Sequence, residues 1–240
     1  MTKNKTINLT APRYWNELNE KQLIYVSWLL NQGGMSEIQV LTYAFVRLTG
    51  LKVVLTYGDD MAIYKKKRQR FSLSAEQVCV FAQQFKYLTE GIEEINPLKK
   101  MARLPASDSR LRGVPFAQYL ACENNYQAYI FTKKEEYLNR LCACFYFKGS
   151  FNDSQTVRLA KRFEKVPLHV RQTVFLWFSG LKKVLKSQFK NYFVEVDLAE
   201  DEQPEAPNMR KQIEQIMRAL SGGDVTKVKD IYNVETWTAL

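Results

Sequence analysis

The sequence predicts a mainly α-helical protein: a multi-helix, bundle-like core with one small β-hairpin insertion and a C-terminal two-helix arm. Two observations predict this fold class. Large apolar residues recur at steps of three and four through most of the 240 residues, which is the period of an amphipathic helix. Between residues 51 and 73 this period gives way to β-branched and aromatic runs on either side of Gly58, a pattern typical of a hairpin.

Residues 113–147 contain the densest apolar pattern and predict a pair of buried central helices. The first helix follows Pro115, because proline is tolerated in a first helical turn, and it ends near Thr132. The second helix covers residues 133–147. Large side chains lie on more than one face of this pair, so other helices must cover it.

Three helices in the N-terminal part have recognisable start signals. Their predicted caps are Asn19, Ser36 with Gln39, and Ser74 with Gln77. A serine followed three residues later by glutamine is a capping box, which satisfies two backbone N–H groups at a helix start. The third helix is expected to bury Val78, Phe81, Phe85 and Leu88. The hairpin between the second and third helices has runs over 52–57 and 61–67, and residues 70–74 are a candidate third strand.

A basic, irregular stretch separates the third helix from the central pair. Residues 91–113 contain two prolines and five cations: Lys99, Lys100, Arg103, Arg110 and Arg112. A loop of this length either wraps the surface or carries contact residues. Two further helices follow the central pair, one starting near Asp153 and a long apolar one running from Pro167 to Phe193. We therefore expect one helical core domain over residues 1–193.

The tail changes composition abruptly. Residues 194–208 contain six acids, two prolines and no base, which predicts an extended acidic linker that meets the basic surface of its own chain or of a neighbouring copy. Residues 209–240 predict the helical arm, which docks on the core or on another subunit because its apolar surface is too large to stand alone. The candidate partner-docking residues are Ile213, Ile216, Met217, Leu220 and Trp237.

The formal charge of +10 favours contact with polyanions or with acidic protein surfaces. Two groups of cations are candidate polyanion-binding residues. The first group, at the end of the hairpin, is Lys65, Lys66, Lys67, Arg68 and Arg70; the second, on the long helix, is Lys182, Lys183, Lys186 and Lys190. The alternative interpretation of the first group is that its lysines guard the edge of a strand against aggregation.

The sequence contains no recognisable catalytic set. It lacks both glycine-rich phosphate-binding motifs and the G-x-S-x-G elbow of serine hydrolases. The four cysteines lie in apolar helical pattern without metal-ligand spacing, and His169 is the single histidine, so neither a metal nor a cofactor is predicted. We expect a protein that is not an enzyme.

Cellular location follows from the same composition. The sequence contains no run of 18 apolar residues and its first residues form no apolar signal core. We therefore expect no membrane contact and a place in the cytoplasm of the producing cell.

Two segments carry a resemblance to a known group of proteins. The segments are RGVPFAQYLACENNYQAYI (residues 112–130) and MRALSGGDVTKVKDIYNVETWTAL (residues 217–240). Together they resemble small helical proteins encoded in the tail and neck gene clusters of phages and prophages of Bacteroides-like hosts, and the Gly-Gly-Asp-Val-Thr-Lys step is similar to the end of tail-assembly proteins. The resemblance implies a virion structural or assembly role and assigns no functional residue.

The expected function is therefore that of a non-enzymatic phage structural or assembly protein, a tail or head-to-tail component or a tail assembly factor. Its partners would be other protein subunits, either further copies of itself or virion neighbours. The alternative is a basic nucleic-acid-binding module, whose binding would weaken steeply with salt.

Overall fold

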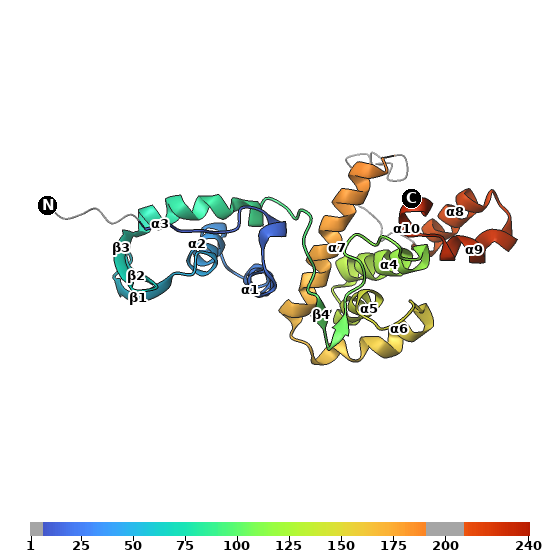
Figure 1. The fold of residues 1–240 in the computed structure, drawn as a ribbon, viewed down its shortest axis with the longest axis horizontal. Helices are drawn as coiled ribbons and strands as arrows, with labels where there is room; N and C mark the ends of the chain where they lie inside the picture. Colours follow the sequence, from blue (N-terminus) through green and yellow to red (C-terminus); the bar gives the residue numbers. More distant parts are fainter. Residues whose placement is uncertain (1–6, 191–208) are drawn as a thin grey trace. The chain divides into compact units, whose positions relative to one another are not determined.

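The computed structural model describes residues 7–190 and 209–240, so the predicted linker over residues 194–208 lies outside the described residues. Its secondary structure is mainly helical, which confirms the predicted class (Figure 1). The chain forms two compact units, residues 1–95 and 96–240. The sequence predicts one core over residues 1–193, whereas the division between the two units falls inside residues 91–113, the stretch interpreted as a basic loop.

The described part of the first unit contains two 3₁₀-helices, three α-helices and a small sheet. Its helical elements are η1 (Trp15–Glu17), α1 (Glu20–Leu30), α2 (Glu37–Leu48), α3 (Ala75–Ala82) and η2 (Gln83–Leu88). All three predicted N-caps are confirmed: Asn19, Ser36 and Ser74 each accept from the backbone N–H three residues later, and the glutamine at that position bonds back. Local sequence therefore sets where these helices begin.

Aromatic residues hold the core of the first unit together. The Trp15 side chain is fully buried, and its indole N–H donates to the carbonyl oxygens of Tyr87 and Gly91 at 3.0 and 2.9 Å. Phe45 and Phe85 are also fully buried and lie 6.4 Å apart between ring centroids. The expectation that Phe81 is buried was wrong, because this side chain is 44% exposed. The α-helix ends at Ala82 and continues as a 3₁₀-helix, so Ala82 joins Val78, Phe85 and Leu88 on the buried side.

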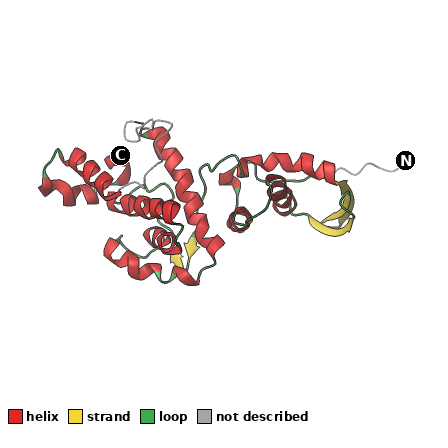
Figure 2. Cartoon of the chain, turned by 180° about the vertical axis from the view of Figure 1, so that it is seen from behind, coloured by secondary structure: helices red, strands yellow, loops and turns green. Residues whose placement is uncertain are grey.

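Three antiparallel strands complete the first unit: β1 (Lys52–Tyr57), β2 (Met61–Lys66) and β3 (Gln69–Ser74), in that order across the sheet. The predicted hairpin is thus extended by the candidate third strand. A β-bulge at Val54 interrupts the pairing of β1 with β2, between Val53 and Leu55. Figure 2 shows how small a part of each unit the strands occupy.

The second unit is built around three packed helices, α4 (Phe116–Thr132), α5 (Glu135–Phe145) and α7 (Leu168–Gln188). The predicted central pair is α4 and α5, which Lys133 joins in a left-handed backbone conformation. Trp177 of α7 stacks on Phe145 of α5 at 3.8 Å between centroids, so the long helix packs on the central pair as the sequence predicted. Around them lie the short strands β4 (Lys100–Met101) and β5 (Leu104–Pro105), α6 (Asp153–Ala160) and the 3₁₀-helix η3 (Phe163–Lys165).

A buried arginine ties α7 to α5. The Arg171 side chain is 6% exposed, and its guanidinium donates to Glu135 and to Asn139, each at 2.6 Å, and to the carbonyl oxygen of Val166 at 2.9 Å. Its charge is thereby paired, and each of its three nitrogens donates a hydrogen bond, which offsets the cost of burying a guanidinium. This arginine is part of the scaffold.

The C-terminal segment packs on its own unit. It consists of α8 (Met209–Ser221), the 3₁₀-helix η4 (Val225–Lys227), α9 (Val228–Asn233) and α10 (Thr236–Ala239). Both the backbone N–H and the hydroxyl of Thr236 donate to the carbonyl oxygen of Val114 at 2.8 Å, and the N–H of Phe116 donates to that of Val234 at 2.8 Å. Of the two docking modes that the sequence left open, the structure has the intramolecular one.

Candidate binding surfaces

One face of the three-stranded sheet presents two adjacent rows of side chains. Lys52, Lys65 and Arg70 are direct cross-strand partners, and so are Leu55, Ile63 and Ser72 in the next row. Residues two apart on a strand share a face, and direct partners have Cβ atoms about 5 Å apart, so the two rows lie side by side on the same face. We call this surface, Lys52, Leu55, Ile63, Lys65, Arg70 and Ser72, the outer face of the sheet.

Apolar side chains are exposed around this face. Every residue of β1 is exposed. Leu55, Tyr57 and Met61 on this face are between 46% and 54% exposed, and Val54 in the bulge is 44% exposed. Val53 is 49% exposed as well, but it is the direct partner of Tyr64 and lies on the opposite face. The opposite face of β2 carries Tyr64, which is buried and stacks on Phe71. The sheet therefore covers its own unit with one face and offers a mixed apolar and cationic surface with the other, which is a feature of interaction sites.

The free edge of β1 is poorly suited to adding another strand. The bulge at Val54 breaks the regular ladder of backbone groups, and Lys52 places a charge at the start of the strand. Both features are devices by which edge strands avoid pairing with other chains. Contact through side chains of the outer face is therefore favoured over the addition of another strand to this edge.

The structure separates the predicted polyanion-binding cations into different environments. Lys65 and Arg70 lie in the outer face, while Lys67 and Arg68 form the exposed turn between β2 and β3, where Lys67 adopts a left-handed backbone. The Lys66 ammonium donates to the carbonyl oxygen of Asn8 at 3.3 Å. Lys183 and Lys186 are exposed on α7, and Lys190 is exposed two residues beyond the end of this helix, which the sequence predicted to run on to Phe193.

Lys182 differs from its neighbours on α7. Its ammonium lies 2.5 Å from Oε1 of Glu123 on α4, with side-chain exposures of 17% and 13%, and 5.2 Å from the centroid of the Tyr126 ring. The charge of Lys182 is therefore used inside the second unit, and the helical spacing that grouped it with the other lysines does not reveal this partner.

The predicted partner-docking residues are used mostly within the chain. The Met217 side chain is buried, Ile213 and Ile216 are half-buried, and Leu220 is 42% exposed. Met217 and Ile213 line a groove of about 370 Å³ where α8 meets α9. The Trp237 indole donates to the carbonyl oxygen of Arg110 and is covered by the Arg112 guanidinium at 4.9 Å.

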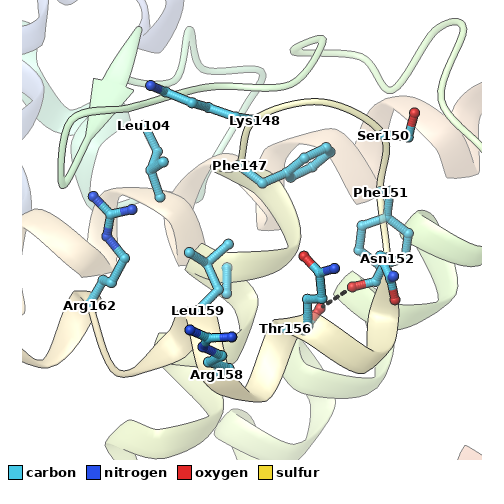
Figure 3. A pocket seen from close by; sticks show the side chains of 12 residues that line it. Leu104, Phe147, Lys148, Ser150, Phe151, Asn152, Thr156, Arg158, Leu159 and Arg162 are labelled. Carbon is cyan, nitrogen blue, oxygen red and sulfur yellow. Dashed lines mark hydrogen bonds between the residues drawn. The ribbon is translucent and has the colours of Figure 1, made fainter.

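A pocket in the second unit was not predicted. It has a volume of about 500 Å³ and is lined by the end of α5, the following turn, α6, Leu104 and Arg162; we call it the α5–α6 pocket (Figure 3). Its lining includes the cations Lys148, Arg158 and Arg162, the rings of Phe147 and Phe151, and Asn152 and Gln155. The sequence signal was the basic side of the helix near residue 158, but that pattern cannot show that aromatic residues and Leu104 complete a cavity.

Polar groups between α4 and α7 come closest to a chemical constellation. The hydroxyls of Tyr126 and Ser179 are 2.9 Å apart, and Ser179 donates to the carbonyl oxygen of Phe175. Burial raises the pKa of the Tyr126 phenol above its usual value. Ser179 therefore receives a hydrogen bond from a neutral phenol and donates its own proton to a backbone carbonyl oxygen, so these contacts join two helices and do not activate the hydroxyl as a nucleophile.

Three of the four cysteines lie together in the core of the second unit. Cys122, Cys142 and Cys144 are buried thiols, and burial raises the pKa of both Cys122 and Cys142. A metal site needs deprotonated thiolates. Among the described residues, no group of three or more His, Cys, Asp or Glu side chains is arranged to hold a metal ion.

The fold and its surfaces define a mainly helical, two-unit protein with an exposed mixed sheet face and one cationic pocket. Compared with protein-family models, with curated proteins and with solved structures, the chain matches none of them. Within the described part of the chain, every helix is too short or too polar to cross a lipid bilayer.

Proposed function

We propose that this chain is a non-enzymatic assembly protein that binds protein subunits through the outer face of its three-stranded sheet. The observation that carries this proposal is the pair of rows on that face, Lys52–Lys65–Arg70 beside Leu55–Ile63–Ser72, surrounded by exposed apolar side chains. An apolar surface with a charged border excludes water at its centre and selects its partner by charge at its rim.

The partner that fits this surface is a second copy of the chain. A cationic row calls for an acidic counterpart, and the chain itself contains one in residues 194–208, with six acids and no base. Contact between the sheet of one copy and a different segment of the next is head-to-tail, and such contacts generate rings or filaments. Rings and filaments suit a phage tail or neck component, the role that the resemblance of residues 112–130 and 217–240 implies.

Light scattering at increasing protein concentration tests the proposal. The full chain should exceed its monomer mass of 28.1 kDa, and Leu55→Glu with Tyr57→Glu should return it to the monomer. Val80→Glu is the matched control, because Val80 is an exposed apolar residue of the same unit outside the sheet. A chain that stays monomeric at about 100 µM in low salt, where charge attraction is strongest, would refute self-assembly.

A second candidate function is nucleic-acid binding through the same end of the sheet. The alignment of Lys52, Lys65 and Arg70 across three strands favours it, because the turn residues Lys67 and Arg68 extend the row. If about five phosphates are contacted, the affinity should fall with a log–log salt slope of about four to five. Lack of binding to single- or double-stranded DNA and RNA at low salt would exclude this function while leaving self-assembly intact.

A further inference from the structure

The α5–α6 pocket has one charged end and one aromatic end. Figure 3 shows Arg162 and the extended Lys148 side chain near Leu104, while Phe151 and Asn152 lie at the opposite end and Phe147 lies between them. Among the described residues that line the pocket, none is acidic, and Asp153 and Glu164, the nearest acids in the sequence, are not part of the lining. The pocket therefore offers an anion site beside a ring site.

The charged end is partly organised in advance. One guanidinium N–H of Arg162 donates to the carbonyl oxygen of Ala102 at 3.3 Å, in the tight turn between β4 and β5 where Ala102 and Arg103 have φ of 48° and 64°. An arginine has five N–H donors in a planar fork, so one tether orients the group and leaves donors for a phosphate. Arg158 lines the same pocket one helical turn earlier.

The aromatic end suits a planar ring. Phe147 and Phe151 meet edge to face, with centroids 5.8 Å apart and planes at 63°. Both side chains are half-buried, so each keeps a contact surface open. Gln155 lines this pocket with an amide group, which can donate to and accept from the edge of a nucleobase. The side-chain oxygen of Asn152 caps α6 by accepting from the backbone N–H and the hydroxyl of Ser154 at 3.0 and 2.7 Å, so Asn152 offers the pocket the N–H donors of its amide. Stacking and edge contacts of this kind are the usual means of binding an unpaired base.

We propose that the α5–α6 pocket binds a nucleotide, with its phosphate at Lys148, Arg158 and Arg162 and its base against Phe147 and Phe151. The volume of about 500 Å³ lies in the usual range of small-ligand sites, about 300–1,000 Å³. A free nucleotide and the 5′-phosphorylated end of a single strand share this chemistry. This site belongs to the second unit, whereas the outer face of the sheet belongs to the first.

Calorimetry on the full chain with matched ligands tests the assignment. AMP should bind at least about tenfold more tightly than adenosine or inorganic phosphate, because each of these satisfies one end of the pocket. A 5′-phosphorylated tetranucleotide distinguishes the sources: tighter binding than AMP identifies a strand end, and weaker binding identifies the free nucleotide. If no binding is detected at AMP concentrations up to about 10 mM, the proposal is overturned, because a weaker affinity would not indicate a specific site.

Paired variants separate the pocket from general attraction to a basic protein. Arg158→Ala with Arg162→Ala should weaken AMP at least about tenfold, as expected when charge-assisted hydrogen bonds are lost. Lys161→Ala with Lys165→Ala removes the same charge from exposed positions outside the lining and should change little. Equal losses from both pairs would overturn the site. The double variant Arg158→Lys with Arg162→Lys keeps the positive charge, so it should bind AMP more tightly than the alanine pair. It replaces the alanine pair as the test variant if the alanine pair does not fold.

The ring site has its own variant. Phe151→Leu keeps the apolar volume but removes the ring, so it should weaken AMP several-fold, as the loss of one base-stacking contact predicts, and leave phosphate binding unchanged. If phosphate binds the wild-type chain as tightly as AMP, no base site exists and the nucleotide assignment fails. If a hexaglutamate peptide binds as tightly as AMP, the pocket takes acidic protein segments and the proposal is likewise overturned.

Discussion

The indole N–H of Trp237 donates to the carbonyl oxygen of Arg110 at 2.6 Å, which ties the last helix to the segment before α4. The Phe189 ring meets the same indole at 5.3 Å, and the guanidinium of Arg112 lies over it. Trp237 is half-buried, and these three contacts pack it against the rest of the second unit. The last residues of the chain thus stabilise the second unit.

Replacing Trp237 should therefore destabilise the protein. Trp237→Ala removes a half-buried ring and leaves the Arg110 carbonyl without its donor, so we expect the free energy of unfolding to fall by about 2–4 kcal/mol. Leu220→Ala, at an exposed apolar position of α8, is the control and should cost less than about 1 kcal/mol. Urea denaturation measures both, and equal effects would show that Trp237 does not anchor the segment.

The elements set by local sequence could be predicted. Helices begin after Asn19, Ser36 and Ser74, and the capping hydrogen bonds of each join it to the residue three positions later. The sequence pattern that predicts the helix start is therefore made of the same residues that form it. The β1–β2 hairpin is equally local, because its turn at Gly58 joins neighbouring strands. Such features need no knowledge of the rest of the fold.

The division into two units was missed for a physical reason. Residues 91–113 show length, prolines and charge, and these suit both a surface loop and a link between two cores. To decide between a loop and a link, one must know which helices share a core. Helical periodicity shows that one face of a helix is buried, but it does not show which other element covers that face.

The candidate binding residues show the same limit. A helical wheel places Lys182 with Lys183, Lys186 and Lys190, but it cannot show that Glu123, 59 residues away, pairs with the first of them. The α5–α6 pocket likewise needs Leu104 to lie beside α6. Charge type can be read from the sequence, whereas the grouping of charges depends on tertiary packing.

Two neighbouring lysines of α7 should respond differently to replacement. Lys182→Met leaves the mostly buried Glu123 carboxylate without its cation, and we expect a loss of about 2–3 kcal/mol in the free energy of unfolding, somewhat below the cost of breaking a fully buried pair. Lys183→Met removes an exposed charge from the next position and should change stability by less than about 0.5 kcal/mol.

The double variant Lys182→Met with Glu123→Leu checks that explanation. Removing both charges should recover most of the stability lost in Lys182→Met, because a buried pair replaced by apolar groups is close to neutral. Denaturation of the single and double variants under one condition gives the coupling energy. No recovery in the double variant would mean that the lysine acts through packing alone.

The thiols should react in two classes. Cys79 is half-buried, whereas Cys122, Cys142 and Cys144 are buried. Burial also raises the pKa of the Cys122 and Cys142 thiols. Alkylation requires the thiolate and access to it, so iodoacetamide near neutral pH should modify Cys79 first. Mass spectrometry should show the other three labelled in urea, and Cys79→Ala should abolish the fast phase. Fast labelling of Cys142 in the native protein would contradict the packed core.

Alkaline pH should weaken the fold through its buried tyrosines. Burial raises the pKa of Tyr64, Tyr87 and Tyr126 above the ordinary value of 10.0. A folded-state pKa above the unfolded one means that the folded chain holds these protons more tightly. The resulting stabilisation is complete below pH 10 and is lost as the pH rises through the raised folded-state values.

The urea midpoint should therefore stay level near pH 8 and fall above about pH 10, while the phenolate absorbance at 295 nm rises. Tyr126→Phe is the diagnostic variant, since it removes one titrating phenol and the hydrogen bond to Ser179. At neutral pH it should cost about 1 kcal/mol, the net worth of one hydrogen bond. Above pH 10 the difference from wild type should shrink, because the wild-type chain then loses stabilisation that the variant never had. A constant difference across this pH range would show that the pKa of Tyr126 is the same in the folded and unfolded chains, so that this residue takes no part in alkaline unfolding.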